Sequence, residues 1–174
     1  MTSPTPLPPA NLRAVTEPLE RIIDPEHFTP RLVSILSNAL VSRESAELRS
    51  RFSLGTNDWR VMSALATKPG ATAKDVSEFL ILNPALISRS VSTLVTRGLI
   101  VLSDGPRGSR PMYLTPEGAT MHDDMLPVSL RGQEIVLEGF TPDEVALLND
   151  LLRRMLGKAP ELQSLDRHKE TAAG

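Results

Sequence analysis

The sequence contains no cysteine, so it can form no disulfide framework, no thiolate metal site and no cysteine redox switch. Aromatic residues make up only 3% of the chain, and its core must therefore be built from aliphatic side chains and methionine. No apolar run approaches the roughly 20 residues that span a bilayer. The N-terminal stretch MTSPTPLPPANLRA also lacks the apolar segment of a secretory signal. We expect a cytoplasmic protein that does not interact with membranes.

What the sequence does contain is an ordinary share of hydrophobic residues, 40%, and of charged residues, 23%. Its 174 residues suit one domain with modest extensions. Seven of the 15 prolines lie within residues 1–30, and the first ten residues offer little to bury. This composition predicts a partly disordered arm over residues 1–28. The apolar residues of 11–27 are spaced like a short amphipathic helix, which either packs on a partner subunit or frays.

Several of the other prolines mark helix starts. In four places a good N-cap residue directly precedes proline, which loses no hydrogen bond at the first helical position. Two further starts have a threonine cap without proline, and apolar residues follow each start at helical spacing. The six helices are predicted to start at Thr29, Thr56, Thr72, Asn83, Thr115 and Thr141.

One part of the chain has a strand pattern. Two short apolar runs, residues 99–102 and 112–114, flank a loop rich in glycine, proline and arginine, which predicts a β-hairpin. The helix after this hairpin is expected from Thr115 to about Glu138, with a kink at Pro127.

The formal net charge of −2 hides an uneven distribution. Residues 1–67 are neutral, residues 68–114 carry a net charge of +3, and residues 115–174 carry −5. The positive segment holds the two short helices and the hairpin. This asymmetry is typical of a nucleic-acid-binding module within an otherwise acidic protein.

Two short helices, a tight turn at residues 81–83 and a hairpin follow one another in the order of a winged helix-turn-helix. The N-terminal end of the second helix can enter the major groove, which is about 12 Å wide. Arg89 is then the candidate for bidentate contact with a guanine, and the helix start at Thr72 is a candidate phosphate site. In the helix that starts at Asn83, the stripe expected to face the core comprises Leu86, Ile87, Val91, Leu94 and Val95.

The loop arginines Arg107 and Arg110 are expected in the minor groove or on the phosphates. The complete set of candidate DNA-binding residues is Thr72, Asn83, Pro84, Ala85, Ser88, Arg89, Ser92, Arg107 and Arg110.

Residues 72–118 resemble the core of the MarR family of bacterial transcription regulators. The stretch SEFLILNPALISRSVSTLVTRGLI aligns without gaps with the family's helix–turn–recognition-helix pattern, and Leu114–Gly118 resembles its exit from the wing. The resemblance covers roughly residues 29–157. The chain departs from the family at Ile81, where a small residue or glycine is usual, and at the wing tip, which has no Asp-Arg-Arg-like sequence.

The resemblance implies a mainly α fold of six helices with a two-stranded β-wing, dimeric through its N- and C-terminal helices. A two-fold dimer favours double-stranded DNA with a pseudo-palindromic operator. The implied segments are an arm (1–28), a dimerisation helix (29–55), the winged helix-turn-helix (56–118), two dimerisation helices (119–157) and a tail (158–174).

The family resemblance also implies a repressor that a small-molecule effector relieves, the effector being an aromatic or phenolic acid or its coenzyme A thioester. The candidate ligand-binding residues are Asn38, Ser42, Arg43, Trp59, Arg60, His122 and Met125.

Two other classes of protein remain as alternatives. A winged-helix module can serve protein–protein assembly without sequence-specific DNA binding. An enzyme is not expected, because the sequence has no nucleophile–base constellation and no phosphate-binding glycine loop. The three histidines, His27, His122 and His168, are too scattered for a metal site, so we expect neither metal nor cofactor.

Overall fold

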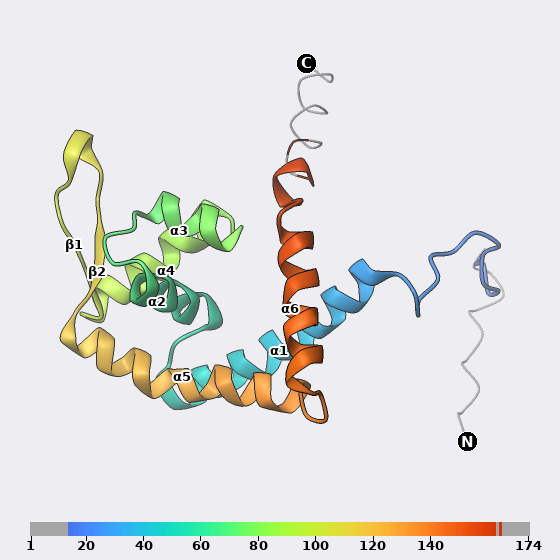
Figure 1. Ribbon diagram of the computed structural model, residues 1–174. Coiled ribbons are helices and arrows are strands. Elements are labelled where there is room, and N and C mark those ends of the chain that lie inside the picture. The colour runs from blue at the N-terminus through green and yellow to red at the C-terminus, as the bar shows by residue number, and fades with distance from the viewer. Residues whose placement is uncertain (1–13, 163, 165–174) are drawn as a thin grey trace, which may run out of the picture. The chain divides into compact units, whose positions relative to one another are not determined.

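The computed structural model describes residues 14–162 and 164, and the chain divides into two compact units, Met1–Leu40 and Val41–Gly174. Residues 1–13 of the expected arm, and residues 163 and 165–174 of the expected tail with His168, lie outside the described residues. The labelled elements of the described residues are six α-helices and one hairpin (Figure 1), which confirms the predicted mainly α fold with a two-stranded wing. Residues 159–162 and 164 are also helical. The elements are α1 (Thr29–Phe52), α2 (Thr56–Thr67), α3 (Ala73–Leu80), α4 (Pro84–Thr96), β1 (Ile100–Leu102), η1 (Pro106–Gly108), β2 (Met112–Leu114), α5 (Pro116–Val136) and α6 (Pro142–Leu156).

Most helices begin where the capping pattern predicts. The N-cap residues of α3, α4, α5 and α6 are Thr72, Asn83, Thr115 and Thr141. For α1 the prediction was wrong by one residue, because Thr29 is already the first helical residue rather than the N-cap. The prediction for α2 was wrong by one residue as well. Its N-cap is Gly55, whose N–H donates to the Asp58 carboxylate at 2.8 Å, so Thr56 lies inside the first turn.

In the first unit, the described part of the arm, residues 14–28, forms no helix, although its apolar spacing resembles one. Its apolar side chains are exposed, and a short helix without a packed face is only marginally stable in water. A turn precedes α1. In this turn the Asp24 carboxylate accepts the Glu26 N–H at 2.9 Å and contacts the His27 ring at 2.8 Å. The Glu26 backbone bond, followed by the His27 ring, lowers the pKa of Asp24.

The second unit holds the hydrophobic core. Helix α2 supplies its centre and packs against α4, α5 and β2. Because the chain has few aromatic residues, methionines fill part of the core, and Met62, Met112 and Met125 have no exposed surface. No helix in the described ranges is long and apolar enough to cross a membrane.

The wing is a short antiparallel hairpin in which Ile100 pairs with Leu114 and Leu102 with Met112. Ile100 and Met112 are buried on its inner side. The tip contains a 3-10 turn, Pro106–Gly108, that the strand pattern did not predict. Arg107 adopts a positive φ of 58° there, and the Gly105 N–H closes the tip on the Ser109 carbonyl at 2.9 Å.

Helices α5 and α6 follow the wing. Helix α5 contains Pro127, as predicted, and ends at Val136, two residues before the predicted end near Glu138. Helix α6 has no buried residue, although one side of it is rich in leucine. Its exposed apolar side chains are Leu147, Leu151, Met155 and Leu156.

Candidate functional site

Helix α3 starts with a reciprocal cap. The Thr72 hydroxyl accepts the Asp75 N–H at 3.3 Å, and the Asp75 carboxylate accepts the Thr72 N–H at 2.8 Å and its hydroxyl at 2.8 Å. The Thr72 backbone bond, followed by its hydroxyl bond, holds the pKa of Asp75 below its ordinary value, with smaller help from Lys68 and Lys74. The Asp75 carboxylate therefore binds the N–H and hydroxyl of Thr72, the residue predicted to mark a phosphate site.

The turn between α3 and α4 is held by side chains on both sides. Ile81 adopts the left-handed conformation (φ 52°) that normally favours glycine. Ser77 is buried, and its hydroxyl donates to the Leu82 carbonyl at 2.7 Å. The Asn83 side chain accepts the Ala85 N–H at 2.8 Å, so this candidate DNA contact caps α4. These bonds set the angle at which α4 leaves the turn.

Helix α4 has one buried and one exposed face. The structure places the predicted DNA-facing residues Pro84, Ala85, Ser88, Arg89 and Ser92 at the exposed side, together on one helix. The inward face is formed by Ile87, Ser90 and Leu94, with Val91 half-buried.

The predicted core stripe of α4 was too wide. Leu86 is 37% exposed and Val95 is 40% exposed. The core contacts of α4 follow residues 87, 90 and 94 along one line, and Leu86 and Val95 lie beside that line.

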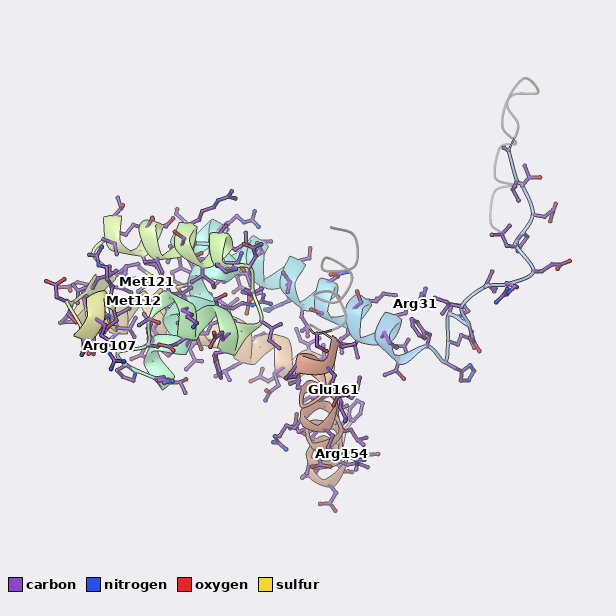
Figure 2. The ribbon with its side chains drawn as sticks, turned by 90° about the horizontal axis from the view of Figure 1, so that it is seen from above. Arg31, Arg107, Met112, Met121, Arg154 and Glu161 are labelled. Atoms are coloured by element: carbon purple, nitrogen blue, oxygen red, sulfur yellow. The ribbon has the colours of Figure 1, made fainter. Side chains whose placement is uncertain are left out.

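The two arginines of the wing lie on the lobe that is formed by α2, α3, α4 and the hairpin. Arg107 and Arg110 are both exposed, and Arg107 lies at the outer end of the hairpin (Figure 2). Within the described ranges, the guanidinium groups of Arg89, Arg107 and Arg110 form no hydrogen bond or ion pair with another side chain or backbone atom. Their donors are therefore available to an external acceptor, and α4 and the wing carry them on one lobe.

The guanidinium of Arg97, by contrast, already has hydrogen-bond partners within the protein. This residue caps the C-terminus of α4, and its Nη1 donates to the Phe52 carbonyl at 2.9 Å and to the Ser53 carbonyl at 3.1 Å. Arg97 was not among the residues predicted to have a role. Its partners are backbone carbonyls at the end of α1, and no residue pattern marks such acceptors.

Among the candidate ligand-binding residues, Trp59 and His122 meet directly. Their rings stack with centroids 5.0 Å apart and planes at 27°, which joins α2 to α5. His122 also contacts the carboxylate of Asp123 at 3.1 Å and lines a cavity of about 380 Å³. Of the residues that line this cavity, only His122 was predicted as a ligand-binding residue. The others are Leu65, Ala66, Pro69, Tyr113, Leu114, Ala119 and Asp123.

The other candidates are not gathered at this cavity. Arg43 donates to the Val128 carbonyl at 3.0 Å and pairs with Glu47 at 3.0 Å, so it fastens α1 to α5. Met125 is completely buried in the core. Arg60 is half-buried on α2, Ser42 is exposed, and Asn38 belongs to the first unit. In residues 14–162 and 164, no group of three or more His, Asp or Glu side chains gathers to hold a metal ion.

Comparison with known proteins agrees with this geometry. Residues 52–111 match the model of the MarR family. No curated protein matches the sequence at a significant level.

Three solved structures illustrate the likeness of fold. The PcaV transcriptional regulator from Streptomyces coelicolor, solved with its natural ligand, is 25% identical with a TM-score of 0.67, over 80% of this chain and 99% of that one. A putative MarR-family regulator from Listeria monocytogenes, complexed with a 26mer DNA, is 17% identical and has a TM-score of 0.75. The match covers 80% of this chain and 95% of that one. A MarR-family regulator from Silicibacter pomeroyi is 22% identical with a TM-score of 0.72, over 77% and 91%.

Proposed function

We propose that the chain is a transcription regulator of the MarR family, whose model matches its winged-helix segment, residues 52–111, and that it binds double-stranded DNA in a sequence-specific manner. The family consists of regulators rather than enzymes, in agreement with the sequence-based expectation. In our proposal, the N-terminal half of α4 lies in the major groove, and the wing reaches the adjacent minor groove or the phosphates.

The observation that carries this proposal is the exposed Arg89. Its guanidinium has no partner in the described residues, and it stands one turn into α4 beside Ser88 and Ala85. An arginine in this position can donate two parallel hydrogen bonds to guanine O6 and N7. Arg107 and Arg110 add positive charge on the same lobe and supply contacts that carry less sequence information.

We propose further that the protein works as a homodimer. The apolar side of α6 supports this, because Leu147 is 59% exposed and Leu156 is 63% exposed although both belong to a leucine-rich helix. Exposed apolar patches of this kind mark interaction sites. A two-fold pair of α4 helices about one DNA turn apart would favour a pseudo-palindromic operator, and such a regulator acts on the nucleoid in the cytoplasm.

The proposed regulatory step is relief of repression by a small aromatic or phenolic acid or its coenzyme A thioester. The cavity beside His122 supports a site at the α2–α5 contact, since it lies where the DNA-binding lobe joins the helix leading to α6. The relative solved with its natural ligand is consistent with this proposal. Arg60 is the cationic candidate nearest in sequence to Trp59, and Asn38, Ser42, Arg43 and Met125 remain the weaker members of the set.

The direct test selects duplexes bound by the protein from random-sequence DNA and measures their affinity at increasing salt concentration. We expect the affinity to fall steeply with salt, because phosphate contacts release counterions. Arg89→Ala should lose about 1–3 kcal/mol of discrimination between the selected and a scrambled duplex. Arg153→Ala is the matched control, because Arg153 lies on the polar side of α6 and its removal takes away the same charge.

Three results would count against the proposal: no sequence enriched in the selection, no salt dependence, or unchanged discrimination with Arg89→Ala. Retained binding of a protein partner by a protein with both Arg89 and Arg107 replaced by alanine would instead favour an assembly module. The effector is sought by thermal-shift measurements with aromatic acids and acyl-coenzyme A compounds, since a bound ligand raises the melting temperature.

A further inference from the structure

Three residues, Arg97–Leu99, join the recognition helix α4 to the first strand of the wing, and we refer to them as the junction. Both elements that are proposed to read DNA start or end at this point. The orientation of α4 and of the wing therefore depends on how the junction is held.

On one side the junction is fastened to the end of α1. Arg97 Nη1 donates to the carbonyls of Phe52 and Ser53 at 2.9 and 3.1 Å. These are acceptors at a helix C-terminus, where the peptide dipoles favour a cation. No other hydrogen bond between the described residues connects the end of α1 with α4 or the junction.

On the other side the junction is fastened to the start of α5. The Thr115 hydroxyl donates to the Gly98 carbonyl at 2.7 Å, and the Thr115 N–H donates to the Leu99 carbonyl at 3.1 Å. Gly118 lies so close to Leu99 that a Cβ atom there would be 1.9 Å from the Leu99 carbonyl oxygen. Backbone thus touches backbone, which leaves little freedom between α5 and the junction.

Helices α1 and α5 are also joined directly to each other. Arg43 donates to the Val128 carbonyl at 3.0 Å, and the Ser129 hydroxyl donates to the Glu44 carboxylate at 2.5 Å. A displacement of either helix is therefore shared by the other and reaches the junction from both sides.

Arg97 is placed for this role rather than for contact with base edges. It follows the last residue of a 13-residue helix. It is therefore about 20 Å from the N-terminal end that enters the groove, at 1.5 Å per residue.

We propose that Arg97 is a positioning residue, which anchors the junction to α1 so that α1 and α5 together set the angle of the recognition helix and wing. This inference rests on the proposed DNA-binding function. It predicts that loss of Arg97 weakens binding to the correct sequence without removing a phosphate contact.

The test uses the full chain and two fluorescent duplexes, one selected by the wild-type protein from random-sequence DNA and one of the same length with a scrambled sequence. Binding is measured by anisotropy at several potassium chloride concentrations for Arg97→Ala, Arg97→Lys, Arg107→Ala and Arg153→Ala. Circular dichroism confirms that each variant is folded at the temperature used. Arg97→Lys serves if Arg97→Ala does not fold, because its ammonium can still donate to one carbonyl.

For Arg97→Ala we expect about tenfold weaker binding to the selected duplex, equal to about 1.4 kcal/mol. We expect scrambled-duplex binding like that of Arg153→Ala and an unchanged slope of log affinity against log salt. Arg97→Lys should recover part of the loss. Arg107→Ala is the contrasting case, in which both duplexes bind less tightly and the salt slope decreases by about one.

Two outcomes overturn the inference while leaving the proposed function intact. The first is a slope reduced by about one with equal losses on both duplexes, which would make Arg97 a phosphate contact. The second is wild-type affinity for the selected duplex in a folded Arg97→Ala protein, which would make its bonds irrelevant to DNA reading. If the wild-type protein itself does not distinguish the duplexes, the proposed function fails and this inference fails with it.

Discussion

A methyl group added at Gly118 tests the contact between α5 and the junction. In Gly118→Ala the new Cβ would lie 1.9 Å from the Leu99 carbonyl oxygen and 2.9 Å from its carbonyl carbon. The neighbour is backbone and cannot rotate away. Its position is fixed by the Leu99 N–H bond to Leu94 at 2.9 Å, by the Thr115 N–H bond at 3.1 Å and by the burial of the Leu99 side chain. Relief requires the first turn of α5 to move by about 1 Å or more.

Two opposing effects decide how much Gly118→Ala changes the free energy of unfolding. Forcing atoms into a packed interior typically costs about 1–3 kcal/mol. Replacing glycine by alanine inside a helix returns roughly 0.5–1 kcal/mol. Because the clash is with backbone, its cost lies near the upper end of the first range, and the free energy of unfolding should fall by a net of about 2–2.5 kcal/mol. This is a large share of the roughly 5–15 kcal/mol typical of natural proteins. The melting temperature should fall by about 2–10 °C for a chain of this length.

The assay is urea unfolding followed by far-ultraviolet circular dichroism at one fixed protein concentration, because the stability of the proposed dimer would depend on concentration. Gly157→Ala is the matched control. Gly157 ends α6 with ordinary helical angles, φ −59° and ψ −18°, and the nearest atom to its new Cβ is the Arg154 carbonyl oxygen at 3.3 Å. That variant should stay within about 0.5 kcal/mol of the wild type. A Gly118→Ala protein as stable as the wild type, or more stable, would refute the close approach.

Three further substitutions test other parts of the structure. Met125→Ala should lower the free energy of unfolding by about 2–5 kcal/mol, because Met125 has no exposed surface, and a loss below 1 kcal/mol in urea unfolding would contradict its core position. Asp75→Asn should reduce stability at pH 7. Since the folded-state pKa of Asp75 is lowered, the difference in free energy of unfolding between the wild type and this variant should be full above the unfolded-state pKa of Asp75. It should disappear as the pH falls through the folded-state pKa, and a difference independent of pH would contradict the capping role. Leu147→Glu should convert a dimer to a monomer in sedimentation experiments, and an unchanged oligomer would exclude this side of α6 from the interface.

The helix starts show how far local sequence reaches. Thr72, Asn83, Thr115 and Thr141 were recognised as N-caps because a cap depends on residues within three positions of it. The same rule failed at Thr29, which is already the first residue of α1. It also failed at Thr56, where glycine supplies only its N–H and Asp58 supplies the acceptor. The spacing of residues 11–27 predicted helix for a segment that, in its described part, has no packed surface to stabilise one.

The exposure of the candidate DNA-binding residues could be predicted from the sequence, whereas the positions of the candidate ligand-binding residues relative to one another could not. Exposure of Ser88 and Arg89 follows from helical periodicity once α4 is located. A ligand site instead requires several elements to meet. Among its seven candidates the rings of Trp59 and His122 stack on each other, while Arg43 is held by Val128 and Glu47. The burial of Met125 and the pairing of Arg43 with the Val128 carbonyl were not visible from residue types.

The sequence by itself determined the order of six helices and a hairpin, the exposed arginines of the second short helix and the wing, and the positive charge of the segment that holds them. Each of these depends on side chains that lie a few positions apart in the chain. Only the tertiary structure decided that Arg97 reaches the end of α1 and that Gly118 lies against the Leu99 carbonyl. These contacts join residues far apart in sequence through backbone atoms, and every residue type has the same carbonyl group, so no sequence pattern distinguishes the acceptors.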